Sequence, residues 1–126
     1  MAGSPFSYAL FRVVPDLRRG EALNVGVLVY CRPLQYLGAR THLDEERLRA
    51  LSPELDATSL AAHLRALERI AAGDADAGPI AALPLDARFH WLTSPSSTIV
   101  QPSEVHTGVC TDPPAQLDRL FSELVL

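Results

Sequence analysis

The sequence contains no lysine, only two cysteines, and no hydrophobic run long enough to cross a membrane. The absence of lysine excludes Schiff-base chemistry, a P-loop lysine and a lysine general base. Cys31 and Cys110 form neither a CxxC pair nor a disulfide framework, so we expect buried thiols unless the fold brings them together as redox partners. The first residues lack the pattern of a secretory signal. These absences predict a cytoplasmic protein with reduced thiols.

A run of basic residues is missing as well. All 11 basic residues are arginines, 15 residues are acidic, and the formal net charge is −4 at pH 7. Because affinity for nucleic acid depends largely on neutralising phosphates, this balance argues against a nonspecific nucleic-acid-binding protein. With 126 residues, of which 48% are hydrophobic and 21% charged, the chain fits a single domain over residues 1–126.

Motifs of known catalytic and metal sites are absent. No G-x-S-x-G nucleophile elbow supports a Ser-His-acid triad, although serines, His106 and acidic residues lie near one another in the sequence. The four histidines have neither HxxxH nor HExxH spacing. We therefore predict no metal site and no cofactor, and these motifs do not decide whether the protein is an enzyme.

The elements that are present alternate between strand-like and helix-like patterns. β-Branched and aromatic runs bounded by turn residues predict strands over residues 6–14, 23–31, about 34–40, 88–92 and 98–101. Capping residues and helical spacing of leucines predict helices over residues 44–51 and 56–72 and from residue 111 or 112 onward. The order βββααββα predicts an α+β fold, a mainly antiparallel sheet of about five strands with helices packed on one face.

A polar segment between the first two strands supplies the first candidate binding residues, Arg18, Arg19, Glu21 and Asn24. A guanidinium here can bind an anion while Glu21 orients it, and the alternative is a solvated turn. Asn24 and Gly26 are poor strand residues within a valine-rich strand. They indicate a ligand, a β-bulge or close backbone packing.

A second polar segment follows residue 93 and offers hydroxyl, amide and imidazole groups. Its candidate binding residues are Ser96, Ser97, Thr98, Gln101 and His106. Such groups resemble parts of a phosphate or carboxylate site, although the glycine-rich turn and helix N-terminus of a typical anion site are missing.

Several short segments carry a family resemblance. These are Tyr8-Ala9-Leu10, Arg19-Gly20-Glu21, Asn24-Val25-Gly26-Val27, Gln101-Pro102-Ser103 and His106-Thr107-Gly108. Over almost its whole length the chain resembles the bacterial family named domain of unknown function 3037. The resemblance implies a small, single-domain cytoplasmic protein without an established activity. It also implies a protein partner, a HipA-like kinase, since genes of the family often lie beside genes for such kinases.

These observations together favour a binding or regulatory module that acts with a protein partner. We expect the two polar segments to meet at one end of the sheet and to bind a partner segment or a small anion. The alternative is a small enzyme that hydrolyses a phosphate or an ester, with His106 as general base and Arg19 stabilising negative charge. A third possibility is a structural subunit, which would expose a hydrophobic patch instead of a polar pocket.

Overall fold

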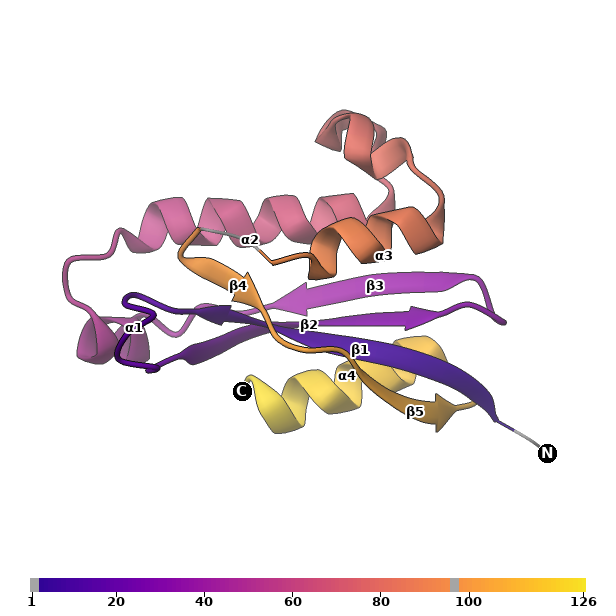
Figure 1. Ribbon diagram of the computed structural model, residues 1–126, viewed down its shortest axis with the longest axis horizontal. Helices are drawn as coiled ribbons and strands as arrows, with labels where there is room; N and C mark the ends of the chain where they lie inside the picture. Colours follow the sequence, from indigo (N-terminus) through magenta and orange to yellow (C-terminus); the bar gives the residue numbers. More distant parts are fainter. Residues whose placement is uncertain (1–2, 96–97) are drawn as a thin grey trace.

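A five-stranded antiparallel sheet forms the centre of the computed structural model, which describes residues 3–95 and 98–126 (Figure 1). Its strands are β1 (Ser4–Val13), β2 (Leu23–Cys31), β3 (Tyr36–Thr41), β4 (Val100–Pro102) and β5 (His106–Cys110). The order is β3-β2-β1-β4, and β5 pairs with the same edge of β1 as β4. Thus β4 and β5 together form one interrupted edge strand along β1.

In the described residues, four α-helices pack around the sheet: α1 (Glu45–Leu51), α2 (Ala57–Ala72), α3 (Leu85–Thr93) and α4 (Pro113–Leu124). Two short 3-10 helices, Ala75–Ala77 and Pro79–Ala82, connect α2 to α3. The side chains of Asp44, Asp56 and Asp112 accept backbone N–H groups at the starts of α1, α2 and α4. None of the helices in the described residues has the length and hydrophobicity needed to cross a membrane.

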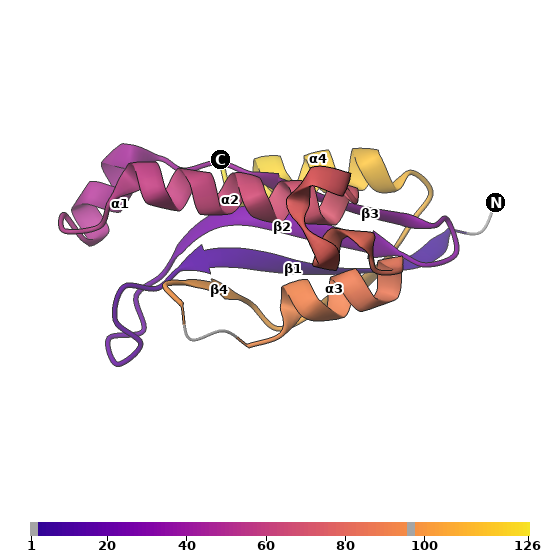
Figure 2. The same cartoon turned by 90° about the horizontal axis from the view of Figure 1, so that it is seen from above.

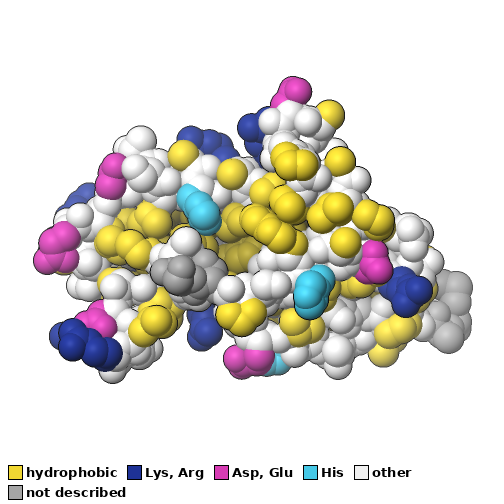
Figure 3. Space-filling model, turned by 45° about the horizontal axis from the view of Figure 1, so that its top comes forward, with side chains coloured by type: hydrophobic (Ala, Val, Ile, Leu, Met, Phe, Trp, Pro, Cys, Tyr) yellow, Lys and Arg dark blue, Asp and Glu magenta, His cyan; other side chains and the backbone are white. Residues whose placement is uncertain are grey.

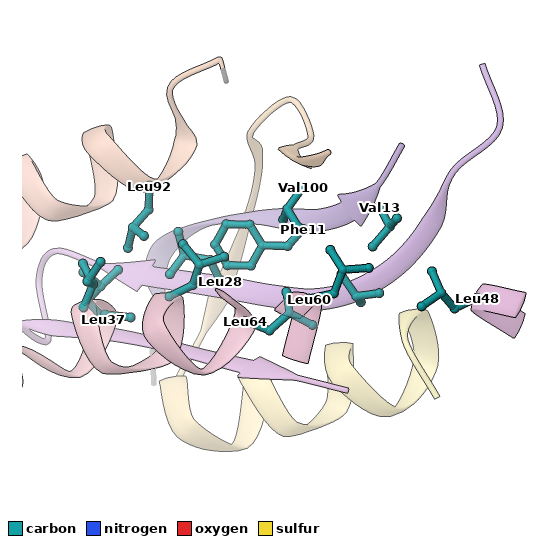
Figure 4. Close-up of a cluster of buried hydrophobic side chains, with 13 residues drawn as sticks. Phe11, Val13, Leu28, Leu37, Leu48, Leu60, Leu64, Leu92 and Val100 are labelled. Atoms are coloured by element: carbon teal, nitrogen blue, oxygen red, sulfur yellow. The ribbon is translucent and has the colours of Figure 1, made fainter. Parts of the chain in front are cut away.

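The helices pack on both faces of the sheet, with α2 and α3 on one face and α4 on the other (Figures 1 and 2). Successive β2 residues alternate between the two layers, so that Leu28 packs towards α2 while Val27 and Val29 pack towards α4. In the first layer, Leu60 and Leu64 of α2 lie near Phe11 (Figure 4). The α+β class and the five antiparallel strands are confirmed, whereas the expectation of helices on one face was wrong. Since β1 and β2 are hydrophobic on both faces, each face needs a helical cover.

Two elements differ from the prediction in the second half of the chain. Residues 88–92 belong to α3 and do not form a strand. Phe89 stacks on Tyr30 with ring centroids 5.0 Å apart, whereas Trp91 is 46% exposed, so these two aromatic residues do not share a face. Strand β5 was not predicted, because its stability comes from pairing with β1 at the distant N-terminus.

Candidate functional site

The predicted binding residues of the β1–β2 loop are exposed and paired locally. Arg18 bonds Asp16, with 3.2 Å between Nη2 and Oδ2, and Arg19 bonds Glu21. The hydrogen bond from the Arg18 side chain lowers the pKa of Asp16, and the bond to Glu21 raises the pKa of Arg19. This geometry matches a solvated, internally paired turn, and an anion would have to displace these carboxylates.

Asn24 is half-buried and lies at a β-bulge. Arg12 is opposite Asn24 and Phe11 is opposite Gly26, which leaves Val25 as the extra residue of β2. The Asn24 amide Nδ2 donates to the carbonyl oxygen of Leu124 over 3.1 Å. The bulge, one of the alternatives that Asn24 and Gly26 indicate, is therefore present, and binding of a ligand by Asn24 stays a prediction.

Gly26 allows close backbone packing beside the bulge. A Cβ atom at this position would lie only 3.0 Å from Cγ2 of Thr41 and 3.1 Å from the carbonyl oxygen of Arg40. Few real Cβ contacts are so short, so the neighbouring strand leaves little room for a side chain. Close backbone packing, the other structural alternative for Asn24 and Gly26, is thus present as well.

The second polar segment lies beside the end of β1. Ser96 and Ser97 are outside the described residues. Thr98 Oγ1 donates to the carbonyl oxygen of Val100 over 2.8 Å, and Gln101 Nε2 donates to the carbonyl oxygen of Thr98. The backbone N–H of Val14 donates to the carbonyl oxygen of Ile99 over 2.8 Å. The start of the β1–β2 loop and residues 98–99 therefore meet through the backbone.

His106 does not join these residues. It lies on β5 opposite Tyr8, with ring centroids 5.1 Å apart, and its Nε2 is 3.7 Å from Oε1 of Glu104. Val100 of β4 is opposite Val13, five residues further along β1, which corresponds to about 17 Å. His106 is thus far more than one water molecule from the Thr98 hydroxyl, and Arg19 lies beyond that end of β1. The geometry does not bring Arg19 and His106 together as the hydrolase alternative requires.

A hydrophobic groove of about 430 Å³ lies between α2, α3 and β4, and we call it the α3 groove. Its lining residues are Phe11, His63, Leu67, Trp91, Leu92, Ser94, Pro95, Thr98, Val100 and Pro102. Figure 3 shows this side of the molecule, where hydrophobic side chains gather around a hollowed surface. The sequence did not indicate this site, because residues 88–92 were expected to form a strand and not the helix that lines the groove. The helical spacing of Leu85, Phe89 and Leu92 was the signal that could have revealed it.

A second hollow, of about 400 Å³, adjoins the α3 groove at Thr98, and we call it the loop hollow. It is lined by Val14, Pro15, Asp16, Leu17, Thr98 and Ile99. The side chains of Leu17 and Ile99 are 72% and 39% exposed. Thr98 thus lines both the α3 groove and the loop hollow.

The two cysteines are buried as free thiols on the α4 face of the sheet. Burial, and then the nearby Cys31, raises the pKa of the Cys110 thiol. A raised pKa leaves less of the reactive thiolate at neutral pH. The expectation of buried thiols is confirmed. Within the described residues, no group of three or more His, Cys, Asp or Glu side chains could hold a metal ion.

Comparison with known families agrees with the resemblance seen in the sequence. A family model described as "Protein of unknown function (DUF3037)" matches residues 8–125. The chain belongs to this family. The match begins within β1 and ends just after α4, so it includes both polar segments and the α3 groove of this DUF3037 protein. No curated protein and no solved structure matches the chain.

Proposed function

We propose that this DUF3037 protein is a binding or regulatory module whose protein partner inserts a hydrophobic segment into the α3 groove. The observation that carries this proposal is the half-exposed Trp91 beside a hydrophobic groove. Tryptophan is enriched among the residues that dominate binding energy at protein interfaces. A large aromatic side chain at the mouth of a groove is suited to that role.

The chemistry of the α3 groove favours a hydrophobic ligand. Phe11, Leu92 and Val100 are 2%, 4% and 6% exposed, and they connect the floor of the groove to the core. Among the described residues that line it, His63 is the one ionisable residue. Burial of hydrophobic surface is therefore the main free-energy gain available here.

The extent of the surface favours a polypeptide segment. The α3 groove and the loop hollow share Thr98, so an extended ligand can contact Trp91, then Ile99 and then Leu17. Arg18 and Arg19, next to Leu17, would form part of a polar rim. In this arrangement Arg18 and Arg19 lie at one edge of the binding surface and not at its centre.

The test is affinity purification of the tagged protein from its native host at near-physiological salt, with mass spectrometry of the proteins that co-elute. The HipA-like kinase implied by the family resemblance is the first candidate partner. We expect Trp91→Ala to lower recovery of a stoichiometric partner about tenfold. Leu34→Ala is the matched control, because Leu34 is 48% exposed but lies in the β2–β3 turn, away from the groove.

Equal recovery of a partner by both variants would place the interface elsewhere and contradict the assignment to the α3 groove. A wild-type protein that is repeatedly recovered alone would contradict the proposed partner itself. Small-ligand screening, including phosphate esters, would then address the alternative of an anion-binding enzyme.

A further inference from the structure

A row of three polar residues crosses the sheet on the face that carries α4. Arg12 of β1 lies directly opposite Asn24 of β2 on one side and Gln101 of β4 on the other. Residues directly opposite in antiparallel strands share a face, with Cβ atoms roughly 5 Å apart. The bond from Asn24 to Leu124, at the end of α4, identifies this face. Since α4 packs mainly on β2 and β3, it leaves the side of the row towards β4 less covered.

The β-bulge is responsible for this row. Val27 and Val29 face α4, so regular alternation would also direct Val25 towards α4 and Asn24 towards α2. The extra residue reverses this, because Val25 packs in the α2 layer while Asn24 lies beside Arg12. Bulges often redirect side chains next to functional sites.

Arg12 differs from the other arginines in the described part of the chain. Five arginines form ion pairs with acidic side chains, and Arg88 donates to the carbonyl oxygen of Ala81. The remaining arginines are Arg12, Arg32, Arg49, Arg65 and Arg119, and Arg12 alone among them is not exposed. The Nε atoms of Arg12 and Arg88 are both buried without an acceptor, but Arg88 is held by its bond to Ala81, whereas Arg12 forms no ion pair or hydrogen bond through its other guanidinium nitrogens. Leaving a charged donor partly buried and unpaired is unfavourable unless an acceptor binds.

We propose that Arg12, Asn24 and Gln101 form a binding site for a carboxylate. The two terminal nitrogens of Arg12, which are not sealed like Nε, offer the planar pair of donors that a carboxylate accepts. The amide nitrogens of Asn24 and Gln101 each donate one hydrogen to a backbone carbonyl, which fixes the position of the amide group. The second hydrogen on each nitrogen remains for a ligand. One positive charge between two neutral amides matches the single charge of a carboxylate better than the roughly double charge of a phosphate monoester.

Asn24 supplies a specific probe, because it is the only asparagine in the chain. Protein labelled with ¹⁵N-asparagine gives one side-chain amide pair, which can be followed by NMR while sodium acetate replaces sodium chloride at constant ionic strength. In the wild-type protein we expect the chemical shifts of the Asn24 side-chain amide to change with acetate concentration until the site is saturated. Arg12→Lys keeps the charge but loses the planar pair of donors, so acetate should bind about tenfold more weakly. Arg65→Lys, at an exposed arginine without an ion pair, should leave the titration unchanged.

Gln101→Glu is a second variant that does not depend on the folding of Arg12→Lys. It places a carboxylate directly opposite Arg12, and this internal partner should abolish the response to acetate. A wild-type shift that does not saturate, or an equal saturable shift in Gln101→Glu, would overturn the site. Saturation by inorganic phosphate at lower concentrations than acetate would overturn the choice of carboxylate. The row lies on the opposite face from the α3 groove, so evidence against the carboxylate site would not count against the proposed protein interface.

Discussion

Single residues in this protein have properties that depend on both faces of the sheet being covered. Cys110 is 6% exposed in the α4 layer, and burial raises the pKa of its thiol above the ordinary value of 9.0. As the pH rises through 9.0, the unfolded chain therefore loses this proton before the folded protein does. The contribution of Cys110 to stability is complete below that pH and is lost as the pH rises towards the folded pKa.

We therefore expect the free energy of unfolding to fall between about pH 8 and pH 10, with a contribution from Cys110 of at most about 1.4 kcal/mol per pH unit. Urea denaturation across this range measures it. Cys110→Ala should make the decline less steep, whereas Val29→Ala, which also removes buried volume from the α4 layer, should keep the wild-type slope. A slope that is unchanged in Cys110→Ala would show that this thiol does not ionise differently in the two states.

At the scale of elements, α3 is where the sequence and the structure differ most. Phe89 packs on Tyr30, whereas Trp91 is half-exposed at the α3 groove, so the two substitutions should have different effects. We expect Phe89→Ala to lower the free energy of unfolding by about 2–3 kcal/mol, somewhat less than for a fully buried phenylalanine. Trp91→Ala should lower it by less than about 1 kcal/mol. Thermal and urea unfolding measure both, and similar losses would instead support a strand with both rings on one face.

Local sequence patterns predicted the elements whose formation depends on neighbouring residues in the chain. Asp44, Asp56 and Asp112 cap three of the helices, and the bulge at Asn24 follows from two residues that fit poorly in a strand. Strand β5 could not be predicted in this way, because its partner β1 lies about a hundred residues earlier in the chain. For the same reason the sequence did not single out Arg12 as a candidate binding residue. Only the register shows that it lies between two amides without an acidic partner.

For the whole molecule, a shared sheet should couple the two helical layers into one unfolding unit. Phe121 of α4 is 5% exposed in the layer opposite α3, and Trp91 on α3 is the only tryptophan in the chain. We expect Phe121→Ala to cost about 3–4 kcal/mol, because a large buried side chain is lost. Since β2 contributes to both layers, the Trp91 fluorescence transition and the far-UV circular dichroism transition should move together to the same lower urea midpoint.

The matched control is Asp118→Asn, also on α4, which removes an exposed ion pair with Arg40. Exposed ion pairs contribute little to the free energy of unfolding, so Asp118→Asn should change it by no more than about 0.5 kcal/mol. Both urea midpoints should therefore stay close to those of the wild-type protein. If Phe121→Ala instead lowered the circular dichroism midpoint while the Trp91 transition stayed in place, the α4 layer would unfold separately. The carboxylate site, whose Asn24 is held by the end of α4, would then be lost while the α3 groove remained. A single coincident transition requires that both sites be lost together, because the same five strands support them.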